Sequence, residues 1–301
     1  MRARLLLPAL ALFFAAFSLH AQGPSDPAYG LSTDFRNWLA ANGYSSYNFQ
    51  RSDVAGGAYG GRVTPGQAVV NHPVIFIHGN SDSALGTISP YTGWTSSISY
   101  FKSQGYTSAE LYATTWGPAD PSQSPLQYHS KAYMTRLRAF IQAVKAYTGA
   151  TKVDIVGHSM GVTLARKAIK GGTAYDSAAS SVDTFVGISG ANRGLTACYF
   201  SGPTTPTCSD VNGLYPGYLI GGFGPYGVSS ILVDMNSTSH YEGSFVYSIW
   251  SQVDEVIGYG TIVYGQSTSA SLARTGRSSS PACPTATLVR RTSPAITSGG
   301  W

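Results

Sequence analysis

The sequence predicts an α/β fold in which helices cover both faces of a mostly parallel central sheet. Two observations lead to this prediction. Apolar runs typical of buried parallel strands alternate along the chain with segments of helical periodicity, and such alternation favours parallel strands joined by crossover helices. The chain has 301 residues, of which 43% are hydrophobic and 11% charged. This length and composition are enough for one sizeable core, so one domain is the simplest arrangement.

The N-terminal segment predicts export. Residues 1–21 contain two arginines, an apolar stretch from Leu5 to Leu19, and small or polar residues up to Ala21. This is the pattern of a secretory signal, with cleavage expected after Ala21. The apolar stretch is shorter than the roughly 20 residues of a membrane-spanning helix, so no transmembrane segment is expected there. The predicted layout is a signal peptide (1–21), an α/β domain (22–271) and a tail of different character (272–301).

The elements of the domain follow from periodicity and from helix-ending glycines. The expected order is a helix (32–43, capped by Ser32 or Thr33 and stopped by Gly43), strand (72–80), helix (94–105), strand (106–117), helix (127–149), strand (152–157), helix (160–170), strand (182–189), a long Gly/Pro/Tyr loop (190–227) and a last strand (244–251).

Residues 157–161, GHSMG, match the G-x-S-x-G pattern between a predicted strand and a predicted helix. A sharp strand-to-helix turn at this place would expose the hydroxyl of Ser159 at the carboxyl edge of the sheet. Gly157 and Gly161 would remove side chains where the strand and helix backbones crowd together. This context favours Ser159 as a nucleophile over an ordinary glycine-rich turn.

A second feature agrees with a nucleophile at this edge. The strand at 72–80 ends in His78-Gly79-Asn80, and in such sheets this loop and the residue after the nucleophile each supply an N–H to an oxyanion hole. The expected donors are Asn80 and Met160. His78 is interpreted as structural, because it precedes the turn that would shape the hole. The ring of His158 is expected to point away from the Ser159 hydroxyl.

Several separate motifs resemble the class 2 lipases of the α/β-hydrolase fold and also an extracellular poly(3-hydroxybutyrate) depolymerase. They are PVIFIHGN, the segment from QYHSKAYM to VGHSMGV, GANRGLTACYF with its following PTC, and VYSIWSQVDEVIG. The resemblance implies a secreted, metal-free carboxylic ester hydrolase that uses Ser, Asp and His in that chain order. It implies Ser159 as nucleophile, Asp254 as the acid, with Glu255 as the alternative, and Asn80 and Met160 as oxyanion donors.

The cysteines fit an exported protein. Cys198 and Cys208 flank a Gly/Pro/Thr loop that could close in an oxidising compartment, and the resemblance implies that they form a disulfide. Cys283 in the tail is left over.

The histidine that the resemblance implies is missing. The family pattern places it after the acid, whereas the six histidines of this chain are His20, His72, His78, His129, His158 and His240. Three explanations stay open. A reading-frame error near residue 272 or a truncated gene could have removed it, His240 could act as the base, or the protein could bind esters without turning them over.

The remaining expectations concern partners. No basic run precedes the tail, so nucleic-acid binding is not expected, and neither C-x-x-C nor H-E-x-x-H occurs, so no metal or other cofactor is expected. The expected substrate is a lipid or a polyester, met at an insoluble surface. Aromatic residues in the 190–227 loop could line the acyl site, meet that surface or pack beneath the loop.

Overall fold

The computed structural model describes residues 30–89, 91–172, 181–254, 256–257, 262–271 and 276–280. The predicted signal peptide, Glu255 and Cys283 lie outside these residues. Among the described residues no helix is both long enough and apolar enough to span a membrane.

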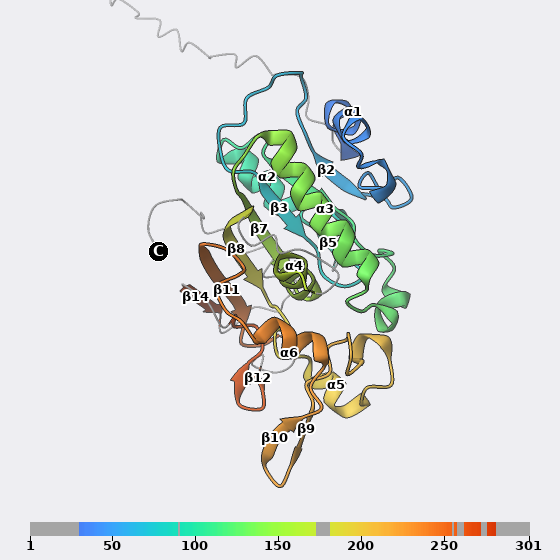
Figure 1. Cartoon of the computed structure of the whole chain (residues 1–301), viewed down its shortest axis with the longest axis vertical. Coiled ribbons are helices and arrows are strands. Elements are labelled where there is room, and N and C mark those ends of the chain that lie inside the picture. The colour runs from blue at the N-terminus through green and yellow to red at the C-terminus, as the bar shows by residue number, and fades with distance from the viewer. Residues whose placement is uncertain are drawn as a thin grey trace, which may run out of the picture.

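Among the described residues the central sheet has eight strands, and most neighbouring strands pair in parallel (Figure 1). Only β2 and β6 pair antiparallel. In spatial order the strands are β1 (Gly30–Leu31), β2 (Ala58–Gly60), β6 (Leu111–Thr114), β3 (Val74–Ile77), β7 (Val153–His158), β8 (Val182–Ile188), β11 (Phe245–Ser251) and β14 (Gly276–Ser280). The mostly parallel sheet predicted from the sequence is confirmed.

The helices and small sheets complete the list of elements. The helices are α1 (Thr33–Ala41), α2 (Thr95–Ser103), α3 (Lys131–Thr148), α4 (Met160–Lys170), α5 (Thr196–Ser201) and α6 (Ser230–Asn236), and 3-10 turns cover Ser45–Tyr47, Pro121–Leu126 and Pro206–Cys208. Three two-stranded sheets pair β4 (Leu85–Ile88) with β5 (Tyr91–Gly93), β9 (Tyr218–Ile220) with β10 (Phe223–Tyr226), and β12 (Ile262–Val263) with β13 (Gln266–Ser267).

Both faces of the sheet are covered because strand side chains alternate between two apolar clusters. In β3, Ile75 and Ile77 belong to the cluster that contains α1, α3 and α4. Val74 and Phe76 point the other way, into the cluster beneath α2. This period of two is what a strand buried on both faces requires.

The helix ends follow the capping signals of the sequence. The Ser32 hydroxyl accepts from the Phe35 N–H and caps α1, and the Ser130 hydroxyl accepts from the Tyr133 N–H and caps α3. Gly149 ends α3 in the left-handed region at φ 74°, which a glycine adopts without a steric penalty.

Two expectations about the second half of the chain are wrong. The 190–227 segment is not a plain loop, because it contains α5, a 3-10 turn and the β9–β10 hairpin. The strand at 244–251 is not the last one, since β14 follows it and pairs in parallel with β11. The sequence of β14 is Gly-Arg-Ser-Ser-Ser, and a strand without an apolar period gives no signal in the sequence.

Candidate active site

Ser159 lies in a strained turn between β7 and α4. Its backbone has φ 50° and ψ −125°, a region that a residue with a side chain adopts only when its surroundings enforce it. The Ser159 N–H donates to the Ile188 carbonyl of the neighbouring strand at 2.9 Å, and the Val162 N–H donates to the Ser159 carbonyl at 3.0 Å. The side-chain hydroxyl has no hydrogen-bond partner among the described residues. Ser159 itself is partly exposed at the carboxyl edge of the sheet.

The two glycines of the GHSMG segment are required by close contacts, as predicted. A Cβ at Gly161 would lie 2.3 Å from the His78 carbonyl oxygen and 2.5 Å from that of Ile77. A Cβ at Gly157 would lie 3.1 Å from the Cα of Val162. The start of α4 is thus pressed against the end of β3 as well as against its own strand, which holds the serine turn in place.

The loop after β3 lies directly against the serine. A Cβ at Gly79 would be 3.2 Å from the Cβ of Ser159. The Asn80 side chain is held by donation to the Ser124 carbonyl at 3.0 Å and by the Ser81 hydroxyl, which donates to its Oδ1 at 3.0 Å. The Asn80 N–H has no acceptor among the described residues. Met160 is the first residue of α4, so its N–H has no intrahelical acceptor.

His78 is structural in this arrangement. The ring is buried and stacks on Trp116 with centroids 5.0 Å apart. Its Nδ1 contacts the Gly79 carbonyl at 2.7 Å, and its Nε2 accepts from the Trp116 N–H at 3.1 Å. Burial lowers the pKa of His78 to about 3, so the ring is neutral with both nitrogens in use and supports the turn before Asn80.

His158 stands next to the serine without a hydrogen bond to its hydroxyl. The Nδ1 atom lies 3.0 Å from where a Cβ of Gly79 would be, and Nε2 is buried with no partner among the described residues. Burial lowers the pKa of His158 to about 4, and the nearby carboxylate of Asp254 opposes that shift. The charge of Asp254 therefore acts on the ring of His158.

Asp254 follows β11 at the same edge of the sheet. It is fully buried, and its Oδ1 accepts from the N–H groups of Ile257 at 2.8 Å and Val256 at 3.1 Å. Its Oδ2 is buried and has no partner among the described residues. Because β8 separates β7 from β11, Ser159 and Asp254 are held by strands about 10 Å apart, a gap that one imidazole ring could bridge.

The structure does not bring His240 to this edge. His240 is exposed and precedes the amino end of β11. The residues that follow it contact the amino ends of the neighbouring strands: Gly243 packs on Asp183, and the Lys152 amine donates to the Ser244 hydroxyl at 2.6 Å. His240 therefore lies at the end of the sheet opposite to Ser159, because parallel strands carry all carboxyl ends to one edge.

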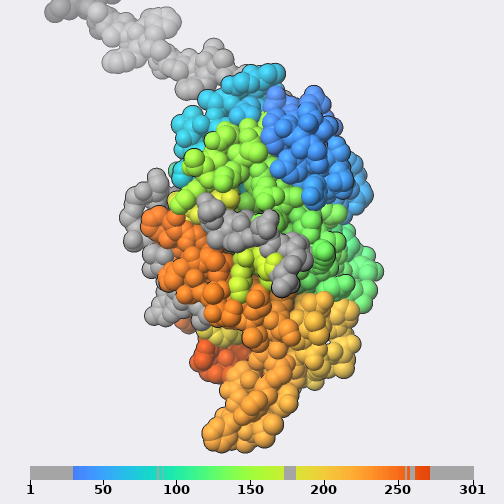
Figure 2. All heavy atoms as spheres, viewed as in Figure 1, coloured from blue at the N-terminus to red at the C-terminus, as the bar shows by residue number. Residues whose placement is uncertain are grey.

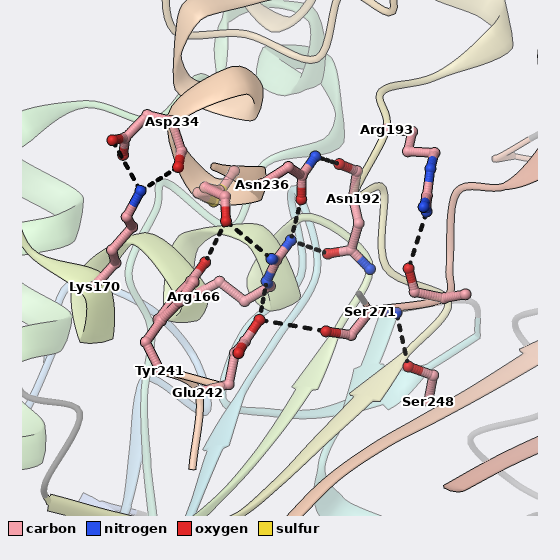
Figure 3. A network of polar contacts seen from close by, with 12 residues as sticks. Arg166, Lys170, Asn192, Arg193, Asp234, Asn236, Tyr241, Glu242, Ser248 and Ser271 are labelled. Atoms are coloured by element: carbon pink, nitrogen blue, oxygen red, sulfur yellow. Dashed lines mark hydrogen bonds and ion pairs between the residues drawn. The ribbon is translucent and has the colours of Figure 1, made fainter. Parts of the chain in front are cut away.

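A buried polar network that sequence reasoning missed joins α4 to Glu242, which precedes β11, and to Ser271 (Figure 3). Arg166 of α4 and Glu242 form a fully buried ion pair at 3.0 Å. Arg166 also donates to Asn192 at 2.9 Å, and the Ser271 hydroxyl donates to Glu242 at 3.3 Å. Residues 268–271 are thereby tied to α4, whose first residue directly follows Ser159.

Arg193 also fixes residues 267–270. Its guanidinium donates to the Ser267 carbonyl at 2.9 Å and the Ala270 carbonyl at 3.2 Å, and its N–H donates to the Thr268 hydroxyl at 2.9 Å. The signal in the sequence was the polar segment ANRG directly after a buried strand, where side chains reach the carboxyl edge of a sheet.

The structure also places the predicted cysteine pair and shows an acidic group that was not predicted. Cys198 of α5 and Cys208 form a disulfide, with Cα atoms 5.1 Å apart. Among the described residues, His72, Asp154 and Asp183 form a group with metal-ligand atoms within 4.8 Å of one another. This group lies at the amino ends of β7 and β8, where Lys152 pairs with Asp183 at 3.2 Å, and it has no connection to the serine site.

The sheet order, the serine turn and the acid after β11 define an α/β-hydrolase. The sequence profile of the family Lipase (class 2) matches residues 71–294. The chain belongs to the class 2 lipase family. The comparison with curated proteins found no match.

The likeness to a solved lipase supports the fold. Lipase B of Aspergillus fumigatus superposes with a TM-score of 0.50 at 15% identity, over 92% of this chain and 55% of that one. The propeptide form of the Bacillus licheniformis lipase BlEst2 gives a TM-score of 0.48 at 13% identity, over 79% of this chain and 51% of that one. At these identities the likeness concerns the fold alone, and this chain spans about half the length of these two proteins.

Proposed function

We propose that this protein is a secreted carboxylic ester hydrolase that uses Ser159 as its nucleophile and forms an acyl-enzyme. The observation that carries the proposal is the backbone of Ser159, at φ 50° between a strand and a helix, with an unpartnered hydroxyl at the carboxyl edge. A strained conformation of this kind persists where function requires it. Membership of the class 2 lipase family supports the same reaction class.

The reaction assigns a role to each group. The Ser159 oxygen attacks the ester carbonyl and transfers its proton to a base, and the carbonyl oxygen becomes an oxyanion held by the N–H groups of Asn80 and Met160. The base then gives this proton to the oxygen of the leaving alcohol as the C–O bond breaks. Water then attacks the acyl-enzyme and releases the acid. The free Oδ2 of Asp254 would orient the base and stabilise its charged form.

A specific observation favours a second candidate function, an ester-binding protein without turnover. No histidine follows Asp254 in the 301 residues, and no described histidine bridges the gap to Ser159. Without a base, a serine site of this kind retains only the oxyanion hole and substrate binding, a rate advantage on the order of 10³ over water.

The substrate class follows from the family. We propose acylglycerols or related lipid esters as substrates, and a polyhydroxyalkanoate polyester is the alternative to be measured beside them. The signal-like residues 1–21 and the Cys198–Cys208 disulfide support secretion.

The test is hydrolysis of p-nitrophenyl butyrate by the purified chain, with Ser159→Ala and, as a matched control, Ser99→Ala on the exposed face of α2. Hydrolysis should fall by at least about 10³-fold in Ser159→Ala and stay unchanged in Ser99→Ala. Equal hydrolysis by the parent and Ser159→Ala would contradict the proposed nucleophile.

Imidazole added to the assay separates the two candidates. If the base is absent from the chain, the parent should be slow and imidazole should accelerate it, while Ser159→Ala should not respond. Fast hydrolysis without imidazole would exclude the ester-binding protein and direct the search for the base to His158→Ala and His240→Ala.

A further inference from the structure

The β9–β10 hairpin is an apolar projection that the reaction does not use. Its strands pair Tyr218 with Tyr226 near the base and Ile220 with Phe223 near the tip. All residues of both strands are exposed. Figure 2 shows the hairpin standing out from the body of the molecule at the end where the chain between residues 190 and 240 gathers. A side chain such as Phe223, 74% exposed, leaves unfavourable apolar surface in water.

The hairpin lies at the same end of the molecule as the serine edge. The Tyr264 hydroxyl donates to the Gly217 carbonyl at the hairpin base. The segment that contains Tyr264 continues to Thr268, whose carbonyl accepts from the Asn192 N–H, four residues after β8 ends. Chain contacts therefore lead directly from the carboxyl edge of the sheet to the hairpin (Figure 1).

The exposed apolar surface continues onto neighbouring elements. Phe200 of α5 is 80% exposed, and its neighbour Tyr199 contacts the ring of Tyr264 at 6.0 Å. The Thr196 hydroxyl of α5 donates to the Ile262 carbonyl at 3.3 Å, and Ile262 is itself exposed. The hairpin is thus the outermost part of a larger apolar surface.

This surface carries almost no charge. Residues 211–233 contain no Asp, Glu, Lys, Arg or His. Asp234, which ends this run, is paired with Lys167 at 2.6 Å and Lys170 at 3.0 Å. An uncharged surface is complementary to an uncharged partner. An anionic partner would add no electrostatic attraction to the binding of this surface.

The order of side chains along the β9–β10 hairpin also indicates how the hairpin would contact a partner surface. Ile220 and Phe223 stand at the tip, whereas Tyr218 and Tyr226 stand nearer the body. Tyrosine prefers a boundary between apolar and aqueous surroundings, because its ring is apolar and its hydroxyl is hydrated. A four-residue strand is about 13 Å long, comparable to the roughly 5–10 Å to which interfacial elements enter a lipid layer. The unpaired edges of a two-stranded hairpin would keep such insertion shallow.

We propose that the β9–β10 hairpin adsorbs the protein to the surface of a fluid, uncharged lipid phase. A rigid polyester surface could contact only one face of the hairpin, whereas a fluid layer can enclose the side chains of both faces. Because both faces are exposed and uncharged, the fluid partner is the one that the geometry favours. Only the delivery of an ester to Ser159 rests on the proposed function, since adsorption itself needs no catalysis.

The test is flotation of the full chain with neutral phosphatidylcholine vesicles. Ser159→Ala serves as the parent, so that vesicle hydrolysis cannot disturb the measurement and a failure of the proposed nucleophile leaves the result intact. The variant Ile220→Ser/Phe223→Ser should lower the bound fraction at least about tenfold, since each substitution removes a large apolar group from the interface. Binding of the parent should not weaken in 1 M salt.

Val70→Ser is the matched control. Val70 is 83% exposed but precedes β3 at the amino end of the sheet, so its removal should leave vesicle binding unchanged. Unchanged binding of the hairpin variant, or no binding by the parent, would overturn the proposal. Loss of binding to a polyhydroxybutyrate film with vesicle binding unaffected would overturn it in favour of a solid polymer. Equal thermal midpoints of all variants would show that folding is not the cause.

Discussion

The part of the chain that carries the serine and the part that carries the acid are stabilised differently. Residues 74–172 pack as apolar layers, with Leu137, Phe140 and Ile141 of α3 buried against β3 and β7. Residues 181–271 share the same apolar core through Phe185, Leu232 and Val246, and they add a disulfide and the buried Arg166–Glu242 ion pair. The comparison teaches that one apolar core joins both parts, whereas directional bonds are concentrated around the part that carries Asp254.

The largest expected effect comes from breaking the buried ion pair. Glu242→Ala leaves the Arg166 guanidinium buried without its counter-charge, so the free energy of unfolding should fall by about 3–5 kcal/mol. The double variant Arg166→Met/Glu242→Leu should recover much of that loss, because it removes both charges together. Urea denaturation of both variants measures the difference. A loss below about 1 kcal/mol in Glu242→Ala would contradict the polar account of the second region.

The next effect concerns the pH dependence of stability and His129, which contacts residues of both parts of the chain. His129 is buried, and its ring contacts the Thr163 hydroxyl of α4 at 2.7 Å and the Asn212 carbonyl at 3.0 Å. Burial lowers its pKa to about 4, below the value of about 6.5 in the unfolded chain. The unfolded state then binds the proton first as the pH falls, so stability is complete above about pH 6.5 and declines toward pH 4.

A histidine of this kind changes the free energy of unfolding by up to about 1.4 kcal/mol per pH unit in this window. For His129 the total between pH 6.5 and pH 4 is about 3 kcal/mol. His129→Gln should reduce the slope of stability against pH, as measured by urea denaturation at several pH values. His78 and His158, whose pKa values burial also lowers, should leave a residual slope of the same sign. An unchanged slope in His129→Gln would show that the ring is not held neutral.

A smaller loss is expected from the disulfide. Cys198→Ser/Cys208→Ser opens a loop with a sequence separation of 10 and should lower the free energy of unfolding by about 2–3 kcal/mol. The parent measured in a reducing agent is the natural comparison, and it should lose the same amount. If reduction leaves stability unchanged, the loop is held by its other bonds.

The smallest effect tests the apolar region. Ile141→Val removes one methylene from a fully buried side chain of α3 and should cost about 0.5–1.5 kcal/mol. Its effect should add to that of Glu242→Ala, because Ile141 packs in the apolar core and takes no part in the polar contacts of Glu242. Strong non-additivity in a double-variant cycle would show that the two regions unfold as one coupled network.

Elements with a regular apolar pattern could be predicted from the sequence, whereas elements without one could not. Apolar period and capping residues predict β3, α3, β7 and α4 within a few residues, because these elements bury a regular stripe or run. The turn at Ser159 follows from its two glycines. Short elements give no such signal, since the residues of β9 and β10 are exposed and β14 contains no apolar side chain.

The site divides in the same way. The proximity of Asn80 to Ser159 follows from strand order alone, whereas the role of Arg166 depends on Glu242 and Asn192, which are far away in the sequence. A buried arginine within a helix of mixed composition looks like a surface residue until the partners are known. The free Oδ2 of Asp254 is likewise a fact of three-dimensional packing.

The conformation of Ser159 has a consequence for how such a protein can change. A non-glycine residue at φ 50° costs on the order of 1–3 kcal/mol that the surrounding bonds must offset. Glycine would occupy the same turn without that penalty. Under the proposed function, a change to glycine would remove both the strain and the hydroxyl that reacts. Stability of the fold and the proposed reactivity therefore place opposite demands on residue 159.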